Sequence, residues 1–319
     1  MVERNKSFQI AANVIMILLS AMCIVPFILL IMSSITKENI LLKYGYSFWP
    51  REISFDAYKT LLVDSGSIVR GYIISALVTV VGTVANLTLT TLFAYPLSRK
   101  ELPGKAFFSF VIFFTMLFNG GLVPSYMMWT GIFHIKNTIW ALIVPNLLMG
   151  AFYVIMMRTY FTTNIPDAVI EAARIDGAGE WRILAKIVLP MSTPIIATLA
   201  LLVGLGYWND WLNGLYYINN DKLYSIQVLL NKMLLDVQYL MSGASGGALT
   251  QSITLPATGI KMAVAVMGAL PILVVYPFFQ KYFVKGIVIG AVKANRILII
   301  ESRLSRYTQE CVRMESLFF

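Results

Sequence analysis

Histidine, cysteine and charge are all scarce in this chain of 319 residues. His134 is the single histidine, so a metal cluster or a catalytic triad built on histidine is excluded. The two cysteines, Cys23 and Cys311, indicate no disulfide framework. Charged residues make up 13% of the chain, against about 25% in soluble domains, and hydrophobic residues make up 58%. The composition therefore predicts an integral membrane protein.

Two kinds of catalytic motif are also missing. No G-x-x-x-x-G-K-[ST] phosphate-binding loop is present, because Gly104-Lys105 is followed by Ala106 and lacks the first glycine. Most of the acidic residues lie in loops on opposite sides of the predicted membrane and form no obvious acid–base pair in a shared pocket. We therefore expect neither ATP hydrolysis by this chain nor any other enzyme activity, and no cofactor or metal of its own. The net charge of +9 needs no nucleic acid, since the orientation rule for membrane proteins accounts for it.

Hydropathy predicts an all-α fold that crosses the membrane six times. A span needs roughly 20 apolar residues to cross a hydrocarbon core of about 30 Å. No charge lies between Lys6 and Lys37, and this uncharged stretch is too long for the apolar part of a signal peptide. The predicted organisation is a cytoplasmic N-terminus over 1–8, a six-span domain over 9–293 and an atypical tail over 294–319. We place the spans near 9–35, 71–98, 106–130, 138–157, 191–212 and 259–283.

Basic residues predict the orientation. The short loop after the second span holds Arg99, Lys100 and Lys105 against Glu101 alone, and such loops stay in the cytoplasm. Both ends of the chain are then cytoplasmic, in a multi-pass protein. Tryptophan favours membrane interfaces, and most of the tryptophans fall at the outer ends of spans in this topology. These are Trp49, Trp129, Trp140, Trp208 and Trp211.

A polar segment over 158–190, between the fourth and fifth spans, carries the most informative motif. It reads E-A-A from Glu171, then Gly177 after three residues, then I-x-L-P from Ile187 after nine more. Pro166 and Asp167 suit the start of a helix, and Gly177 suits its end, which predicts a helix over about 166–176. Small alanine side chains would let this helix press its backbone into a groove on another protein. The alternative is an ordinary amphipathic loop helix.

The motif matches the EAA loop of permease subunits in bacterial ABC importers, and the chain resembles this family over roughly 8–293. The resemblance is strongest to the MalG-like permeases of carbohydrate importers. Within these, the stretch 119–126, the W-N-D-W segment at 208–211 and the G-A-V-K ending at 290–293 resemble the LplC/YtcP branch. The resemblance implies a cytoplasmic coupling helix that sits in a cleft of an ATPase subunit. The coupling residues would be Glu171, Ala172, Ala173, Asp176, Gly177, Ile187, Leu189 and Pro190.

The same resemblance implies the partners. They are a homologous second permease that forms a heterodimer with this chain, two ATPase subunits that bind ATP and Mg, and an extracytoplasmic solute-binding lipoprotein. The location implied is the bacterial cytoplasmic membrane. The substrate implied is an oligosaccharide, and some members of the branch handle uronate-bearing ones. The loops 36–70 and 213–258 are candidate surfaces for the binding protein. Family members usually end soon after the G-A-V-K-G stretch, so we attach no function to the tail.

Polar residues inside spans are costly and normally face a bundle interior or a water-filled path. Asparagines in four spans therefore predict either a substrate path or hydrogen bonds between helices. Asn119-Gly120-Gly121 also predicts a backbone break in the third span. The aromatic and amide groups of 207–213 suit stacking on sugar rings and hydrogen bonding to hydroxyls, and resemble the W-N-x-[FW] stretch of sugar permeases. The candidate path residues are Asn86, Asn119, Asn146, Tyr207, Trp208, Asn209 and Trp211.

Two other classes of protein compete with an ATP-driven importer. A secondary transporter driven by an ion gradient is expected to place ionisable residues or broken helices near the bilayer midplane. The predicted spans hold asparagines but almost no charge, and the E-A-A motif would be unexplained. A membrane-bound scaffold or sensor would need a sizeable soluble output domain, which the sequence does not contain.

Overall fold

The computed structural model describes residues 6–62, 65–241 and 258–278, and these ranges are helical apart from loops and one isolated bridge between Thr36 and Ile53. The predicted tail and the end of the last span lie outside the described residues. The chain divides into two compact units, each built from several separate stretches of sequence. The first comprises 1–79, 123–145 and 208–274, and the second 80–122, 146–207 and 275–319.

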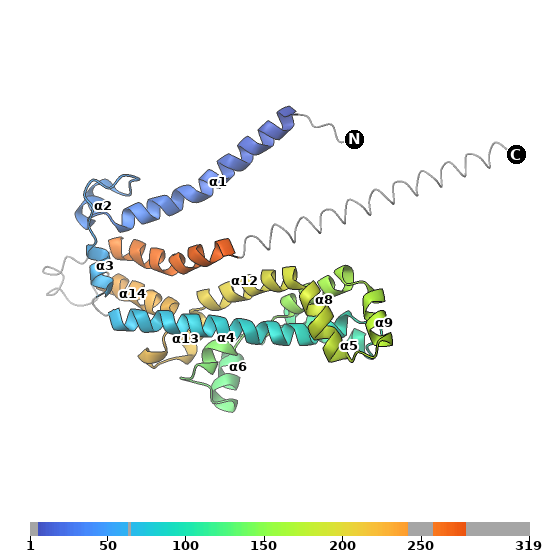
Figure 1. Cartoon of the computed structure of the whole chain (residues 1–319). Helices are drawn as coiled ribbons and strands as arrows, with labels where there is room; N and C mark the ends of the chain where they lie inside the picture. Colours follow the sequence, from blue (N-terminus) through green and yellow to red (C-terminus); the bar gives the residue numbers. More distant parts are fainter. Residues whose placement is uncertain (1–5, 63–64, 242–257, 279–319) are drawn as a thin grey trace. The chain divides into compact units, whose positions relative to one another are not determined.

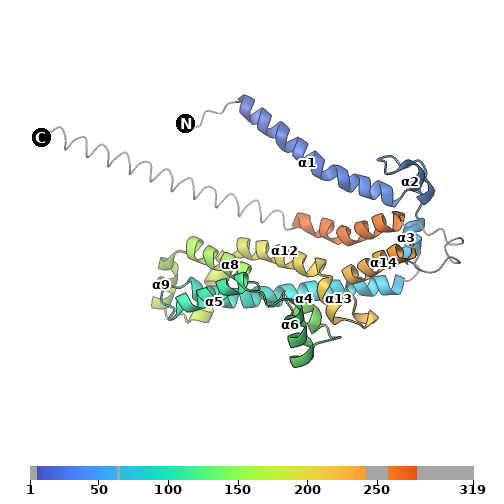
Figure 2. The same cartoon turned by 180° about the vertical axis from the view of Figure 1, so that it is seen from behind.

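In the first unit, three helical segments distant in the sequence pack together. The start of helix α4 (Ser65–Ser98), helix α14 (Ile226–Met241) and the helix Thr258–Phe278 lie side by side in both views of Figures 1 and 2. Their shared core includes Ile68, Ile226 and Val264. The other elements are α1 (Lys6–Ser34), α2 (Glu38–Tyr44), α3 (Asp56–Leu61), α6 (Leu122–Met127), η2 (Met128–Ile132), α7 (Trp140–Ile143), α13 (Leu212–Tyr217) and η4 (Asp221–Leu223).

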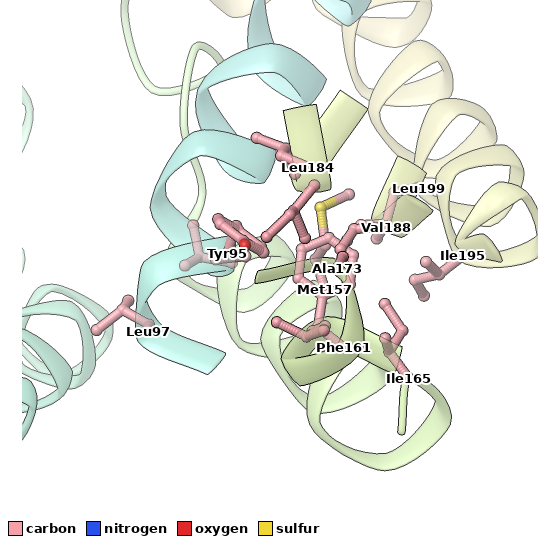
Figure 3. Close-up of a cluster of buried hydrophobic side chains, with 14 residues drawn as sticks. Tyr95, Leu97, Met157, Phe161, Ile165, Ala173, Leu184, Val188, Ile195 and Leu199 are labelled. Atoms are coloured by element: carbon pink, nitrogen blue, oxygen red, sulfur yellow. The ribbon is translucent and has the colours of Figure 1, made fainter. Parts of the chain in front are cut away.

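The second unit gathers short helices around the last part of α4. Its core contains Met157, Phe161 and Ile183, which are fully buried. Figure 3 shows the cluster, in which Ala173 lies beside Met157 and Phe161. The elements that contribute are α5 (Lys105–Leu117), α8 (Ala151–Asn164), α9 (Asp167–Ile175), α10 (Glu180–Ile183), η3 (Leu184–Val188), α11 (Leu189–Met191) and α12 (Thr193–Asn209).

The structure gives three to five candidate spans among the described residues. Phe8–Ser34, Gly66–Ser98 and Thr258–Phe278 are each long and apolar enough to cross a membrane, and they match the first, second and last predicted spans. The predicted third span corresponds to a bent pair of helices, and the predicted fifth span corresponds to the second helix of another bent pair. The first pair, Lys105–Leu117 and Leu122–Ile132, bends by 113°, and the second, Glu180–Met191 and Thr193–Asn209, bends by 80°.

The predicted fourth span over 138–157 is not one continuous helix in the structure. Helix α7 ends at Ile143, and α8 begins only at Ala151. Pro145 lacks the N–H that a continuing helix needs, and Asn146 takes a left-handed conformation with φ of 61°. Hydropathy does not detect this interruption, because the residues around it remain apolar.

Candidate functional site

Helix α9 (Asp167–Ile175) lies where the sequence predicts the coupling helix, within one residue at each end. Pro166 stands just before the helix in an extended conformation, with ψ of 134°, and is not in its first turn. After the helix, Gly177 adopts φ of +77°, a conformation that costs glycine little, and its N–H donates to the carbonyl of Arg174. Asp176 caps the C-terminus by donating its N–H to the carbonyl of Ala172.

The helix has one buried face and one exposed face. Ile170 and Ala173 are 2% and 8% exposed and belong to the core of the second unit. Glu171, Ala172 and Ile175 are exposed, Ile175 at 86%. Ala173 is therefore part of the core of this unit, whereas Ala172 lies on the exposed face, and the coupling role of both alanines stays a prediction.

The residues of the I-x-L-P end of the motif also differ in their burial. Ile187 lies in the π-helical turn η3 and Leu189 begins α11, and both pack half-buried against the same core as α9. Pro190 is exposed. These residues hold the end of the 158–190 loop against the unit that carries α9, so their position is consistent with a role in positioning the helix.

An ion-pair network ties α9 to the elements around it. The Arg174 Nη1 donates to the carboxylate of Glu101 at 2.7 Å, and the Arg174 Nε donates to that of Glu180 at 2.9 Å. The other carboxylate oxygen of Glu180 accepts from the hydroxyl of Tyr95 at 2.5 Å. Arg174 thus joins α9 both to the loop after α4 and to α10. The sequence does not reveal this network, because Tyr95 and Glu180 lie 85 residues apart and Glu101 and Arg174 lie 73 residues apart.

A second contact holds the start of α9. Lys100 Nζ lies 2.8 Å from a carboxylate oxygen of Asp167, and Arg99 Nη1 lies 3.9 Å from the other. The hydrogen bond from Lys100 holds the pKa of Asp167 below its usual range and raises the pKa of Lys100. Because the pKa of Asp167 is lower in the folded than in the unfolded chain, the contact stabilises the folded state at pH values above the unfolded-state pKa of this carboxyl group. This stabilisation is lost as the pH falls through the folded-state pKa. The contact is therefore intact near neutral pH.

Two candidate path asparagines, Asn86 and Asn119, hydrogen-bond to backbone groups within the second unit, and a third, Asn146, has a left-handed backbone. Asn86 is fully buried, donates from Nδ2 to the Leu147 carbonyl at 2.6 Å, and accepts from the Thr90 hydroxyl at 3.1 Å. Asn119 accepts from the N–H of Gly121 at 2.9 Å at the bend before α6. Asn146 supplies the left-handed residue at the helix break. The bond from Asn86 to Leu147 favours the alternative of hydrogen bonds between helical segments, and the place of all three asparagines in a substrate path stays a prediction.

The aromatic path candidates Tyr207 and Trp208 also make close contacts within the protein. Tyr207 is buried in the second unit, where its ring packs so tightly on Gly82 that a side chain there would overlap it. Trp208, in the first unit, donates from Nε1 to the Gly268 carbonyl at 3.2 Å and stacks on Tyr72 at 6.3 Å between ring centroids. Both side chains are held by packing. They are therefore placed to shape their surroundings more than to contact a solute directly.

Asn209 and Trp211 do line a pocket, within the first unit. Its volume is about 420 Å³, inside the range of about 300–1,000 Å³ that small-molecule sites occupy. Gln227 and Asn231 of α14 add two more amides to its wall, and Gly268 of the last helix lies opposite them. In the predicted topology α14 falls within the loop 213–258, so the sequence does not point to these amides.

Comparisons with known proteins place the chain in a family. Residues 86–289 match the family described as "Binding-protein-dependent transport system inner membrane component". The chain is 35% identical to the polygalacturonan/rhamnogalacturonan transport system permease protein YtcP of Bacillus subtilis over 91% of this chain and 99% of that protein. It is 36% identical to the protein LplC of the same organism over 86% of this chain and 90% of that protein.

One solved structure is also similar to this chain. The chain matches a bacterial ABC transporter involved in the import of the acidic polysaccharide alginate, with a TM-score of 0.73, 28% identity and coverage of 89% of this chain and 99% of that chain. The chain belongs to the family of binding-protein-dependent transport system inner membrane components. It is a multi-pass permease subunit of an ABC transporter and not an enzyme, and the predicted resemblance to the LplC and YtcP permeases is confirmed.

Proposed function

We propose that this permease imports oligosaccharides at the expense of ATP hydrolysed by partner subunits. It would form the translocation path with a homologous second permease, receive its substrate from an extracytoplasmic solute-binding lipoprotein, and hydrolyse no ATP itself. ATP and Mg would bind to two cytoplasmic ATPase subunits. The N- and C-termini would lie in the cytoplasm, as the basic loop around Arg99 and Lys100 suggests.

The observation that carries the mechanism is the two-faced geometry of α9. Its inner face is anchored by Ile170 and Ala173, while Glu171 and Ala172 remain exposed. A helix that is fixed to its own subunit and exposed toward a partner can pass on a movement of that partner. The ion pairs of Arg174 with Glu101 and Glu180 then offer a route from α9 to the end of α4 and to α10. This arrangement supports α9 as the coupling helix.

The substrate class rests on the relatives. The names of two similar proteins refer to polygalacturonan, rhamnogalacturonan and alginate, which are all acidic polysaccharides. Others refer to arabinooligosaccharides and to melibiose, raffinose and stachyose. We therefore propose an oligosaccharide, and a uronate-bearing one as the first choice.

Transport by the complete assembly in lipid vesicles tests this function. Uptake would be measured with a galacturonate trisaccharide, arabinotriose and raffinose, with ATP or a non-hydrolysable analogue supplied to the ATPase side. The proposal predicts uptake of at least one sugar that needs hydrolysable ATP and survives an ionophore. Uptake that continues without ATP and stops with the ionophore would favour a secondary transporter instead.

A further inference from the structure

Residues of α14, of the last helix and of the end of α12 with the segment after it give this pocket a polar and aromatic lining. Asn209, Gln227 and Asn231 bring three neutral amides to it, and Trp211, 40% exposed, adds an aromatic face. Among the described residues that line it, the rest are apolar and none is charged. Amides can both donate and accept hydrogen bonds, which suits hydroxyl groups that also do both. An indole face beside them suits the apolar face of a sugar ring.

The packing around the pocket explains how it stays open. Trp208 donates to the Gly268 carbonyl at 3.2 Å, and Tyr72 donates to the Met267 carbonyl at 2.9 Å. These bonds fix the last helix against its neighbours. Gly268 has no side chain, and a Cβ built there would lie 3.6 Å from the amide atoms of Gln227. Any side chain larger than alanine at this position would extend into the space in front of the Gln227 amide.

We propose that this pocket is a saccharide subsite that recognises hydroxyl groups, with Asn209, Gln227 and Asn231 as hydrogen-bonding residues and Trp211 as the stacking surface. The inference rests on the proposed function, since it assigns part of the sugar path to this subunit. No cation lines the pocket among the described residues, so a carboxylate on the sugar is not selected here. Selection for uronates, where it occurs, must come from elsewhere in the assembly.

Near-isosteric substitutions test the subsite. Gln227→Met and Asn231→Leu remove the amides and keep the approximate volume, while Gln238→Met makes the same change at an exposed position of α14 outside the pocket. Uptake of the three sugars named above would be measured against concentration in the complete assembly. We expect the half-saturating concentration to rise about tenfold in each pocket variant, as loss of a hydrogen bond to a hydroxyl predicts, with maximal ATP hydrolysis retained. The Gln238→Met variant should match the native protein.

Chemical protection gives an independent readout. Ala265 also lines the pocket. An Ala265→Cys variant that also carries Cys23→Ser and Cys311→Ser has one thiol in this chain, at the pocket. A transported sugar should slow alkylation of this thiol in the assembly.

The outcomes separate the two proposals. Uptake of none of the three sugars by the native assembly would overturn the proposed function, and this inference with it. Uptake by the native assembly with unchanged half-saturation in both pocket variants, or alkylation at Ala265→Cys that no transported sugar slows, would overturn the subsite alone.

Discussion

Arg174 on α9 and Glu101 in the loop after α4 lie 73 residues apart in the sequence, and their charged groups meet at 2.7 Å. The same guanidinium holds Glu180 at 2.9 Å. The Arg174 side chain thus connects α9 to the loop after α4 and to α10, within one unit. If α9 moves with an ATPase partner, this contact is placed to carry the movement onward.

Replacing Arg174 with glutamine should weaken coupling more than stability. Partly exposed ion pairs contribute about 0.2–1 kcal/mol each, so we expect thermal unfolding in detergent to change little. Stimulation of ATP hydrolysis by loaded binding protein should fall several-fold, because α9 loses both of its carboxylate partners. The Arg182→Gln variant removes a nearby exposed cation and serves as the control. Stimulation equal to that of the native assembly in Arg174→Gln would exclude this route.

The two alanines of the motif should respond differently to a larger side chain. Ala173→Leu places extra volume in a packed core and should destabilise the chain by about 1–3 kcal/mol, measured by thermal unfolding. Ala172→Leu lies on the exposed face and should leave stability unchanged while reducing co-purification of the ATPase subunits. Equal loss of stability in both variants would mean that the faces of α9 are assigned wrongly.

Two glycines after α9 allow the energetic cost of a left-handed backbone to be measured without steric overlap of an added side chain. Neither Gly177 nor Gly179 has a neighbouring atom within 4 Å of an added Cβ, so alanine meets no steric obstacle at either position. Gly177 has φ of +77° and Gly179 has φ of −72°. Gly177→Ala should therefore cost about 1–2 kcal/mol in unfolding free energy, whereas Gly179→Ala, at the N-cap of α10, should cost only about 0.5 kcal/mol. Matching losses in the two variants would contradict the left-handed end of the helix.

Asn86 should matter for folding more than for sugar recognition. Its replacement by leucine leaves the Leu147 carbonyl and the Thr90 hydroxyl without their partner, at a cost of about 1–3 kcal/mol. We expect a lower thermal stability, and an unchanged half-saturating sugar concentration in whatever protein assembles. A raised half-saturating concentration with native stability would return Asn86 to the substrate path.

The parts of this fold that local chemistry controls could be predicted from the sequence. Helix α9 begins after Pro166 and ends before Gly177, and both residues act through their own backbone. The break in the third predicted span also follows from the local Asn119-Gly120-Gly121 run, and the helix does end at Leu117 and resume at Leu122.

Features that depend on distant residues could not be predicted. The interruption around Pro145 is stabilised by Asn213, whose Nδ2 donates to the Pro145 carbonyl at 3.0 Å across 68 positions of sequence. The amides of Gln227 and Asn231 line a pocket only because α14 packs beside the last helix. Hydropathy describes each segment separately, so it contains no information on either arrangement.

Coupling of this permease to ATP hydrolysis through α9 can be tested by the ATPase rate of the complete assembly in lipid. The rate would be measured with and without sugar-loaded binding protein for the native chain, Glu171→Ala and the control Asp236→Ala, which removes an exposed carboxylate from α14. We expect Glu171→Ala to lose most of the stimulation while the Asp236→Ala control retains it. Full stimulation and full transport in a correctly assembled Glu171→Ala variant would contradict the assignment of coupling to this residue.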